Sequence, residues 1–212
     1  MADNYLGKKM EDYMAGRGLS STKKSQPSLH KLLLRNRSHR AYDNSFTVRE
    51  DQLRKIIDVN TKTPSARNQQ VLRFRPVLKD EAQFITPYIK LGGALPELNL
   101  PQEGFDPNAY IIICTTKEED RWVDVDLGIA AQSMLLQATE IGLNGICIGA
   151  FNKEAIKETF KLQYEPLLIL GIGRGAERIL LTEIEEGADH KYYRKDGVHY
   201  VPKLRLEDLI IK

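Results

Sequence analysis

Apolar residues in the first part of the chain recur at the spacing of amphipathic helices. One helix is expected over residues 3–16, followed by an exposed linker rich in glycine, serine and lysine. Ser28 is a candidate N-cap for a second helix that ends near residues 35–38. Thr47 and Glu50 have the spacing of a capping box in front of a third helix. This part of the chain is therefore predicted to be mainly helical.

Later segments have the patterns of strands. Residues 71–78 alternate in side-chain character, and residues 108–116, "NAYIIICTT", form a run of β-branched residues typical of a buried central strand. Two further strands are expected at residues 145–148 and 166–173, with Asn152 capping a helix between them. The chain thus alternates between strands and helices without a regular βαβ order.

Two segments are expected to be irregular or extended. Residues 84–107 contain four prolines and three glycines, and long irregular loops of this kind are often binding loops. We expect this excursion to cover a site. The end of the chain, "YVPKLRLEDLIIK", has few helical signals and is predicted to be extended.

Residues 126–141, "DLGIAAQSMLLQATEI", form a predicted helix that is apolar almost all round. Two environments suit such a helix: a subunit interface, or a central position between a sheet and other helices. The pattern alone does not distinguish them.

The order of elements favours an α+β fold with a sheet covered by helices. A chain of 212 residues is long enough for one substantial core. We predict an N-terminal helix and linker over residues 1–27 and one domain over residues 28–212.

Composition narrows the class of protein. The hydrophobic content of 42% and charged content of 28% are those of an ordinary soluble domain. No apolar run is long enough to span a membrane, and the start of the chain has no signal-peptide core, so a cytoplasmic protein is expected. Cys114 and Cys147 lie singly in apolar segments and are predicted to be reduced core residues. The histidines have no metal-ligand spacing, so no metal site is predicted.

The charge is unevenly distributed. Residues 1–60 hold 12 Lys and Arg against 7 Asp and Glu, whereas the whole chain has a net charge of +2. This excess is too small and too poor in aromatic residues for nucleic acid to be the expected partner. A small anionic ligand fits better.

The stretch "LLLRNRSHRAYD", residues 32–43, concentrates this charge. Arg37, Ser38 and Arg40, here called the arginine clamp, lie between two predicted helices where their side chains can converge. Guanidinium groups and a hydroxyl suit phosphate oxygens. The alternative is a solvated basic face paired with acids such as Asp43.

Two other motifs bear on the ligand. "GIGRG" at residues 171–175 lacks the spacing and the following helix of a dinucleotide loop, so it is interpreted as a turn at a strand end. "PSARNQQ" at residues 64–70 combines small residues with amides, which lets the backbone approach a flat polar heterocycle.

The arginine clamp and the 64–70 loop together resemble the FMN-dependent nitroreductase family, in which an Arg-Arg-Ser-x-Arg-like segment precedes a Pro-Ser-x-x-Asn-x-Gln loop. The segment "DLGIAAQSMLLQATEIGLNGICIGAF" is similar to that family's long dimer helix and flavin-facing turn. The resemblance covers residues 28–212. It implies a nitroreductase-like fold with a central, mostly antiparallel sheet and a long buried helix at a dimer interface.

The resemblance also implies roles for particular residues. The arginine clamp would hold the phosphate and ribityl groups of FMN. Asn36 stands where the family often has arginine, so either Arg35 compensates or one phosphate contact is missing. A basic residue near the C-terminus, Lys203 or Arg205, would complete the phosphate site. The remaining implied FMN contacts are Pro64, Ser65, Ala66, Asn68 and Gln70 from the partner subunit, and Ile148, Gly149 and Ala150 beside the ring.

The implied activity is hydride transfer from NADH or NADPH through FMN to a small planar acceptor such as a nitroaromatic or a quinone, in a homodimer. FMN would carry the chemistry, so no catalytic acid or base is assigned. The alternatives are a flavin-binding or sensing protein with little turnover, and an anion-binding protein without flavin.

Overall fold

The structure is a computed structural model that describes residues 27–93, 100 and 102–211. The helix expected over residues 3–16 and nearly all of the predicted linker lie outside the described residues. Within the described part of the chain, no helix is both long and apolar enough to cross a membrane.

A four-stranded antiparallel sheet forms the centre of the main body, with strand order β1-β2-β4-β3. Its strands are β1 (Leu72–Val77), β2 (Ala109–Thr115), β3 (Asn144–Ile148) and β4 (Glu165–Gly173). All seven residues of β2 are buried. The predicted central strand and the strands over residues 71–78, 145–148 and 166–173 are thereby confirmed.

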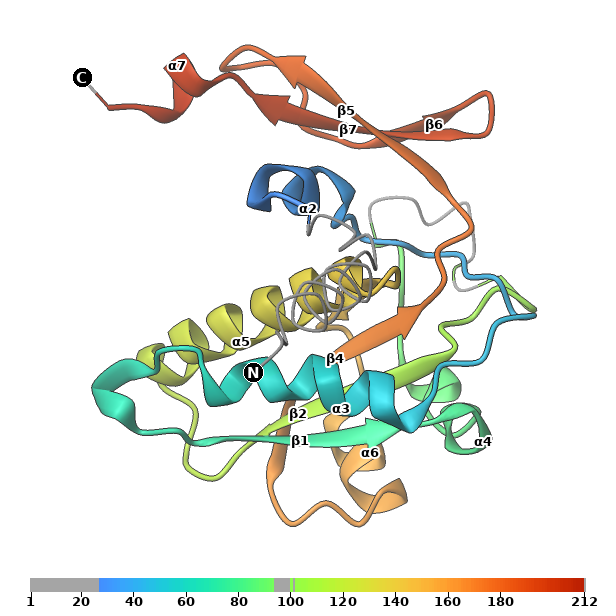
Figure 1. Cartoon of the computed structure of the whole chain (residues 1–212), viewed down its shortest axis with the longest axis vertical. Coiled ribbons are helices and arrows are strands. Elements are labelled where there is room, and N and C mark those ends of the chain that lie inside the picture. The colour runs from blue at the N-terminus through green and yellow to red at the C-terminus, as the bar shows by residue number, and fades with distance from the viewer. Residues whose placement is uncertain (1–26, 94–99, 101, 212) are drawn as a thin grey trace, which may run out of the picture.

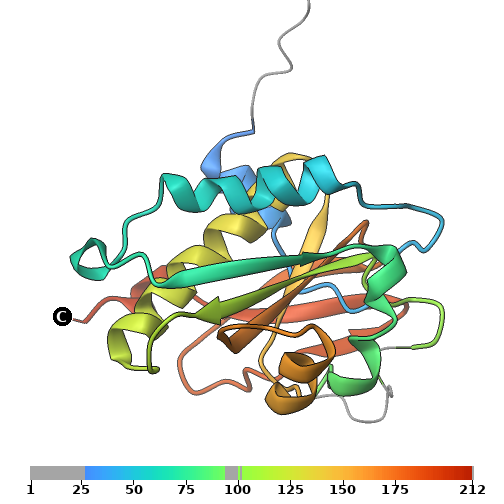
Figure 2. The same cartoon turned by 90° about the horizontal axis from the view of Figure 1, so that it is seen from below.

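Helices cover both faces of this sheet (Figures 1 and 2). One face carries α3 (Glu50–Asp58) and α5 (Arg121–Glu140), and the other carries α4 (Lys79–Ala82) and α6 (Lys153–Thr159). Alternate residues of β2 enter the two cores: Ile111 packs towards α3 and α5, and Ile112 packs towards α6. The predicted α+β fold is confirmed.

A second, three-stranded sheet lies apart from the first, with strand order β5-β7-β6 (Figure 1). It consists of β5 (Arg178–Ile184), β6 (Tyr193–Lys195) and β7 (Val198–Leu204), and β5 pairs with β7 in parallel. Helix α2 (Leu29–Arg35) lies between this sheet and α5 (Figure 1). We call the second sheet the C-terminal sheet.

Three local predictions are wrong in their boundaries. Helix α3 begins at Glu50, and its N-cap is Arg49 instead of Thr47. The Arg49 N–H donates a hydrogen bond to the Gln52 side chain at 3.0 Å. The start is shifted because the preceding residues stay extended and bury Val48. Helix α5 begins before residue 126, because Asp120 caps it and accepts from two backbone N–H groups. The chain end is only partly extended: after β7 it turns into α7 (Leu206–Leu209) beyond the last residue of its partner strand β5.

The two remaining caps are confirmed. Ser28 accepts from the Lys31 N–H at 3.4 Å at the start of α2, and Asn152 accepts from the Ala155 N–H at 3.0 Å at the start of α6. Both predictions were based on a polar residue that directly precedes apolar residues at helical spacing.

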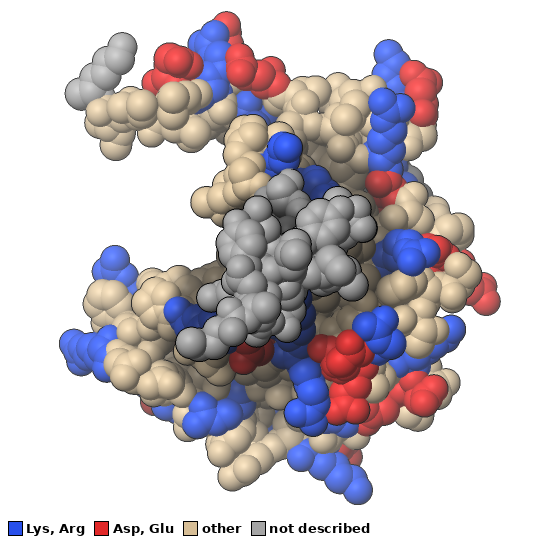
Figure 3. Space-filling view, in the orientation of Figure 1, with Lys and Arg blue, Asp and Glu red and all other residues tan. Residues whose placement is uncertain are grey.

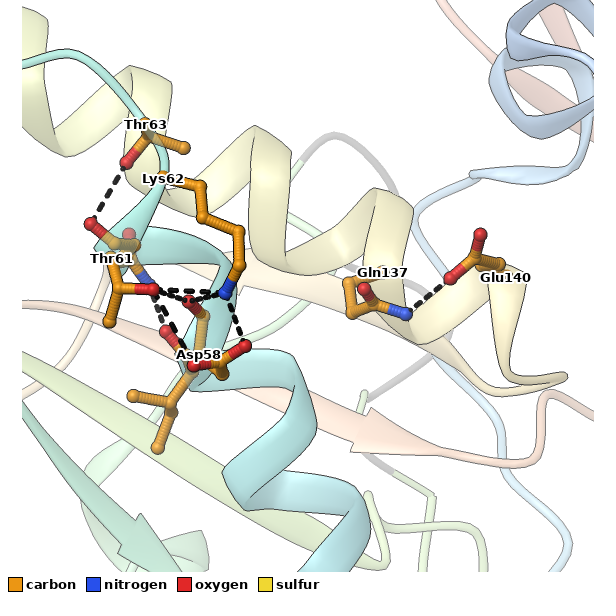
Figure 4. A network of polar contacts seen from close by, with 8 residues as sticks. Asp58, Thr61, Lys62, Thr63, Gln137 and Glu140 are labelled. Atoms are coloured by element: carbon orange, nitrogen blue, oxygen red, sulfur yellow. Dashed lines mark hydrogen bonds and ion pairs between the residues drawn. The ribbon is translucent and has the colours of Figure 1, made fainter.

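The end of α3 is fixed by a small polar network (Figure 4). Lys62 Nζ lies 2.5 Å from the Asp58 carboxylate and 3.0 Å from the Thr61 hydroxyl, which itself donates to the Asp58 carbonyl at 2.8 Å. These contacts close the short 3-10 helix η1 (Val59–Thr61). They lie where the chain leaves α3 and approaches the 64–70 loop.

Candidate cofactor-binding site

A cavity of about 340 Å³ lies between the C-terminal sheet and the segment that carries the arginine clamp. Arg37, Ser38 and Arg40 line one wall, and Lys203 lines the opposite wall. The floor is provided by residues of α5 and β3, including Gln132 and Cys147. The structure therefore brings the three clamp residues together with one of the two C-terminal basic candidates.

The clamp segment is held in place by backbone hydrogen bonds to the main sheet region. The His39 N–H donates to the Gly145 carbonyl at 3.2 Å, and the Asp43 N–H donates to the Arg174 carbonyl at 2.8 Å. The buried Tyr42 donates its hydroxyl to the His39 carbonyl at 3.0 Å. The segment is thus fixed on both sides, which limits the motion of the clamp side chains.

The glycines of the 171–175 motif make this arrangement possible. A Cβ atom at Gly175 would overlap the imidazole of His39, and a Cβ atom at Gly173 would lie 2.7 Å from Tyr42 Cδ1. The motif lies at the end of a strand, as predicted, but its interpretation as a turn is wrong: residues 171–173 belong to β4, and Gly175 forms an antiparallel bridge with Tyr42. Because these glycines have no side chain, His39 and Tyr42 of the clamp segment can pack directly against their backbone.

The two arginines of the clamp are held by hydrogen bonds within their own segment. Arg37 donates Nη2 to the Leu33 carbonyl at 2.7 Å, and Arg40 donates Nη1 to the Ser38 carbonyl at 3.1 Å. The Nε atoms of both arginines are buried and lack a hydrogen-bond partner among the described residues. Burial lowers the pKa of Arg37. These two Nε atoms do not face the open cavity, and the wall is suited to an anion because both guanidinium groups carry a positive charge and line the cavity.

The opposite wall follows the period-2 alternation of β7. His199, Val201 and Lys203 share the face that lines the cavity. His199 is 2% exposed and its Nδ1 has no partner in the described structure. Its pKa is lowered, chiefly by burial and then by the nearby Arg40 charge. This wall therefore adds a cation and a buried imidazole to the anion-accepting surface.

The other basic candidates are placed differently. Arg205 lies 2.9 Å from the Glu185 carboxylate and 3.3 Å from that of Asp208, and the hydrogen bond to Asp208 raises its pKa. Arg35 is exposed at the end of α2 and does not line the cavity. Asn36 does line it, and its amide approaches Gln132 Oε1 at 3.5 Å.

No aspartate or glutamate is among the described residues that line this cavity. Its charged side chains are three cations, Arg37, Arg40 and Lys203. The guanidinium of Arg40 also lies 4.7 Å from the ring centroid of Tyr192, which is a favourable stacking distance. The cavity is consequently positive and has one aromatic wall.

The 64–70 loop lies elsewhere, beside the first half of α5. Its 3-10 helix η2 (Ala66–Asn68) is held by the buried Asp126, which accepts from the Ala66 N–H at 2.7 Å and from Gln69 Nε2 at 2.8 Å. Arg67, Asn68 and Gln70 have φ values of 53°, 53° and 46°, in the left-handed region that non-glycine residues seldom adopt. The buried carboxylate therefore secures a strained loop.

Within one copy of the chain, this loop and the arginine clamp lie apart. Asp126 and Gln132 are six residues apart on α5, which is about 9 Å along the axis and on different sides of the helix. Pro64, Ser65 and Gln70 instead line a separate groove of about 930 Å³ between α3, β1 and α5. Ala66 and Asn68 line neither space.

The turn after β3 begins two residues beyond Cys147, which lines the cavity. Cys147 lines the cavity, the next residue, Ile148, is buried, and Gly149 and Ala150 are exposed. The Lys90 N–H donates to the Ala150 carbonyl at 2.8 Å. The described start of the 84–107 excursion thus lies beside this turn.

The sequence prediction for Cys147 is wrong, whereas that for Cys114 is confirmed. Cys114 is buried in the sheet, but Cys147 points to the side of β3 on which the cavity opens and is exposed. Sequence reasoning also missed Tyr192, His199 and Val201. The alternation of "VHYVPKL" would have placed two of these with Lys203, had the strand been recognised.

Comparison with known proteins identifies the class. The sequence model of the nitroreductase family matches residues 33–174, more than half of the chain, and the chain belongs to this family. It is 24% identical over 178 residues to "Putative NAD(P)H nitroreductase YdgI" of Bacillus subtilis, covering 66% of this chain and 85% of that protein. A shorter match to "Putative nitroreductase MJ1384" of Methanocaldococcus jannaschii is 39% identical over 57 residues, only 27% of this chain and 29% of that protein.

Solved structures show the same fold. A nitroreductase family protein from Clostridium difficile 630 is 25% identical with a TM-score of 0.57, covering 71% of this chain and 86% of that chain. An "FMN-dependent Nitroreductase" from Clostridium difficile R20291 is 25% identical with a TM-score of 0.55, covering 71% and 89%. A "putative nitroreductase in complex with FMN" from Exiguobacterium sibiricum is 18% identical with a TM-score of 0.58, covering 71% and 90%. The predicted nitroreductase fold is confirmed.

Proposed function

We propose that the protein is an FMN-dependent oxidoreductase that transfers hydride from NADH or NADPH to a small planar acceptor such as a nitroaromatic or a quinone. The observation that carries the proposal is the cavity lined by Arg37, Arg40 and Lys203, with no carboxylate among the described residues that line it. Membership of the nitroreductase family and the FMN named for two of the similar solved structures support FMN as the ligand.

The residues present fit the phosphate end of FMN. A phosphate dianion offers several acceptor oxygens to the guanidinium groups of Arg37 and Arg40, the Ser38 hydroxyl and the Lys203 ammonium, all from residues that line the cavity. The cavity volume of about 340 Å³ lies at the low end for cofactor sites, so the cavity would enclose the phosphate and part of the ribityl chain. Because Arg205 is engaged by two carboxylates, Lys203 is the better C-terminal candidate.

Each wall would have a separate task. The clamp would orient the phosphate, and the guanidinium of Arg40, stacked on Tyr192, would be held against rotation. Gly149 and Ala150 would lie beside the ring system. Arg35 is exposed, and we assign it no contact with the phosphate. When bound, FMN supplies the hydride-transfer chemistry, and the protein supplies binding, orientation and electrostatics.

The proposed site requires a homodimer. The 64–70 loop does not reach the clamp within one protomer, so Pro64, Ser65, Ala66, Asn68 and Gln70 would act on the flavin of a second copy. The exposed apolar residues support association. Trp122 and Val125 on α5 are 47% and 43% exposed, and Leu206, Leu209, Ile210 and Ile211 at the chain end are more than half exposed.

The shape of the molecule fits this arrangement. Figure 3 shows an open notch between the body and the overhanging chain end, and Figure 1 shows that it lies above the first half of α5. A second copy seated in the notch would cover apolar surface on α5 and α7 together. Sedimentation of the purified protein tests this directly: a dimer is expected, and a monomer at micromolar concentration would contradict the shared site.

Spectroscopy of the flavin tests the proposed activity. The purified protein, or the protein incubated with FMN, should show the visible absorption bands of an oxidised flavin. Addition of NADH or NADPH without oxygen should bleach those bands, and a nitroaromatic or quinone should restore them. Bound flavin that neither nucleotide reduces would favour the alternative of a flavin-binding protein with little turnover. A protein that takes up no FMN would refute both.

A further inference from the structure

Glu177 is a buried carboxylate that lies behind the cavity and does not line it. It is the last residue before β5, and its side chain is only 8% exposed. The carboxylate accepts hydrogen bonds from the backbone N–H groups of Arg40 and Ala41, the latter at 3.1 Å. It also pairs with the guanidinium of Arg194 on β6. One side chain thus contacts two parts of the chain that are far apart in sequence.

These two parts carry opposite walls of the cavity. Arg40 belongs to the arginine clamp, and Arg194 lies opposite His199 in the register of β6 and β7. His199 and Lys203 form the wall that faces the clamp. Glu177 is therefore bonded to the backbone of one wall and to the strand next to the other.

The surrounding backbone reinforces the first of these contacts. The Ala176 N–H donates to the Ala41 carbonyl at 2.9 Å, and Tyr42 and Gly175 form an antiparallel bridge. Residues 41–43 consequently run beside residues 174–176 and bring the Arg40 N–H to the Glu177 carboxylate. This direction also points the Arg40 side chain towards Tyr192.

The charge distribution gives Glu177 a second effect. Arg37, Arg40, Lys203 and Arg194 lie in or beside the cavity, and cations held together repel one another when no anion is bound. A carboxylate behind the wall offsets part of this repulsion without presenting a negative charge to the ligand. It would keep the cavity assembled before an anion enters, which is the condition for tight binding.

We propose that Glu177 is a positioning residue that assembles the phosphate-binding cavity by joining the arginine clamp to the hairpin of β6 and β7. The inference rests on the proposed function, because it takes the phosphate of FMN as the ligand of the cavity. It adds that anion affinity depends on a residue that does not touch the anion.

The test compares ligands with and without a phosphate. Glu177→Gln keeps an oxygen acceptor for the backbone N–H groups but removes the charge and turns an amide N–H₂ towards Arg194. We expect FMN affinity to fall at least about tenfold, since charge-assisted contacts are lost. Riboflavin, which lacks the phosphate, should bind with an affinity within about twofold of its wild-type value because the ring contacts do not involve this wall.

Two further variants make the result specific. Arg194→Gln leaves Glu177 and its backbone bonds in place and removes only the link to β6, so it should weaken FMN less than Glu177→Gln and leave riboflavin binding unchanged. Glu165→Gln is the matched control, because it removes a carboxylate that pairs with Lys157 at 2.6 Å far from the cavity. It should change neither affinity. If Glu177→Gln fails to fold, Arg194→Gln and Glu177→Asp provide the same comparison.

The outcomes separate the inference from the proposed function. Equal FMN affinity in the wild type and in Glu177→Gln would refute the positioning role and leave the FMN site intact. Equal losses for FMN and riboflavin would show a general structural effect and would also refute it. A wild-type protein that binds inorganic phosphate but not FMN would refute the proposed function alone, and the same variants would then be compared for phosphate affinity. A wild type that binds neither would refute both.

Discussion

Replacing Asp126 with alanine tests the contact that secures the 64–70 loop. The carboxylate is 3% exposed and accepts two hydrogen bonds, from the Ala66 N–H at 2.7 Å and from Gln69 Nε2 at 2.8 Å. Both donors belong to a loop with three non-glycine residues in the left-handed region. Removing the acceptor leaves these donors without their partner and the loop without its anchor.

The expected loss of stability follows from these two bonds. Hydrogen bonds to a charged group contribute on the order of 1.5–3 kcal/mol each, which gives a gross loss of about 3–6 kcal/mol. Ala66 and Gln69 are only half-buried, so water replaces part of the loss. The loop can also relax from its left-handed conformations, which cost about 1–3 kcal/mol each when strained. A net loss of about 2–3 kcal/mol in the free energy of unfolding is therefore expected.

Urea denaturation of the flavin-free protein measures this quantity. With an ordinary dependence on denaturant, the midpoint should fall by about 1 M or more without a change in slope. Asp124→Ala is the matched control on the same helix, because Asp124 is exposed in the first turn. Its replacement should change the free energy of unfolding by less than about 1 kcal/mol. A midpoint for Asp126→Ala that equals that of the control would refute the reasoning.

Three other variants test the cavity and its supports. Arg40→Ala should weaken FMN binding by about tenfold to a hundredfold while leaving riboflavin binding nearly unchanged, since a charge-assisted contact to phosphate is lost, and titration of both ligands measures this. Gly175→Ala should destabilise the protein by about 1–3 kcal/mol, because the added Cβ overlaps His39, whereas Gly128→Ala, with open space around it, should be neutral or stabilising in the same denaturation assay. Burial lowers the pKa of His39, so the unfolded chain binds its proton more readily than the folded protein does. That contribution to stability is complete above the ordinary histidine pKa of about 6.5 and is lost as the pH falls through the lower pKa of the folded state. His39→Asn should therefore reduce the loss of stability between about pH 7 and 5, and an unchanged pH profile would contradict this account.

Much of the fold was predictable because local signals agreed with the tertiary structure. Residues 109–115 of the run "NAYIIICTT" are buried on both faces as their composition indicates, and Ser28 and Asn152 cap the helices that follow them. The Thr47 capping box failed because burial of Val48 outweighed the local preference and moved the start of the helix. Tertiary packing decided that boundary.

The candidate site was only partly predictable. Arg37, Ser38 and Arg40 are adjacent in sequence and line one wall, as the spacing of their side chains suggested. The opposite wall comes from residues 192–203, more than 150 residues after the clamp in the sequence, so His199 and Tyr192 carried no local signal that joined them to the clamp. The choice between Lys203 and Arg205 depended on the register of β7 and on the acids beside Arg205, neither of which is visible in the sequence.

A crystal structure of the protein with FMN bound tests the central claim most directly. The account predicts that the FMN phosphate lies in the cavity between Arg37, Arg40 and Lys203, with the 64–70 loop of a second protomer near the ring. A phosphate located in the groove between α3 and β1, or at any position that leaves Arg37, Arg40 and Lys203 without a contact to it, would contradict it.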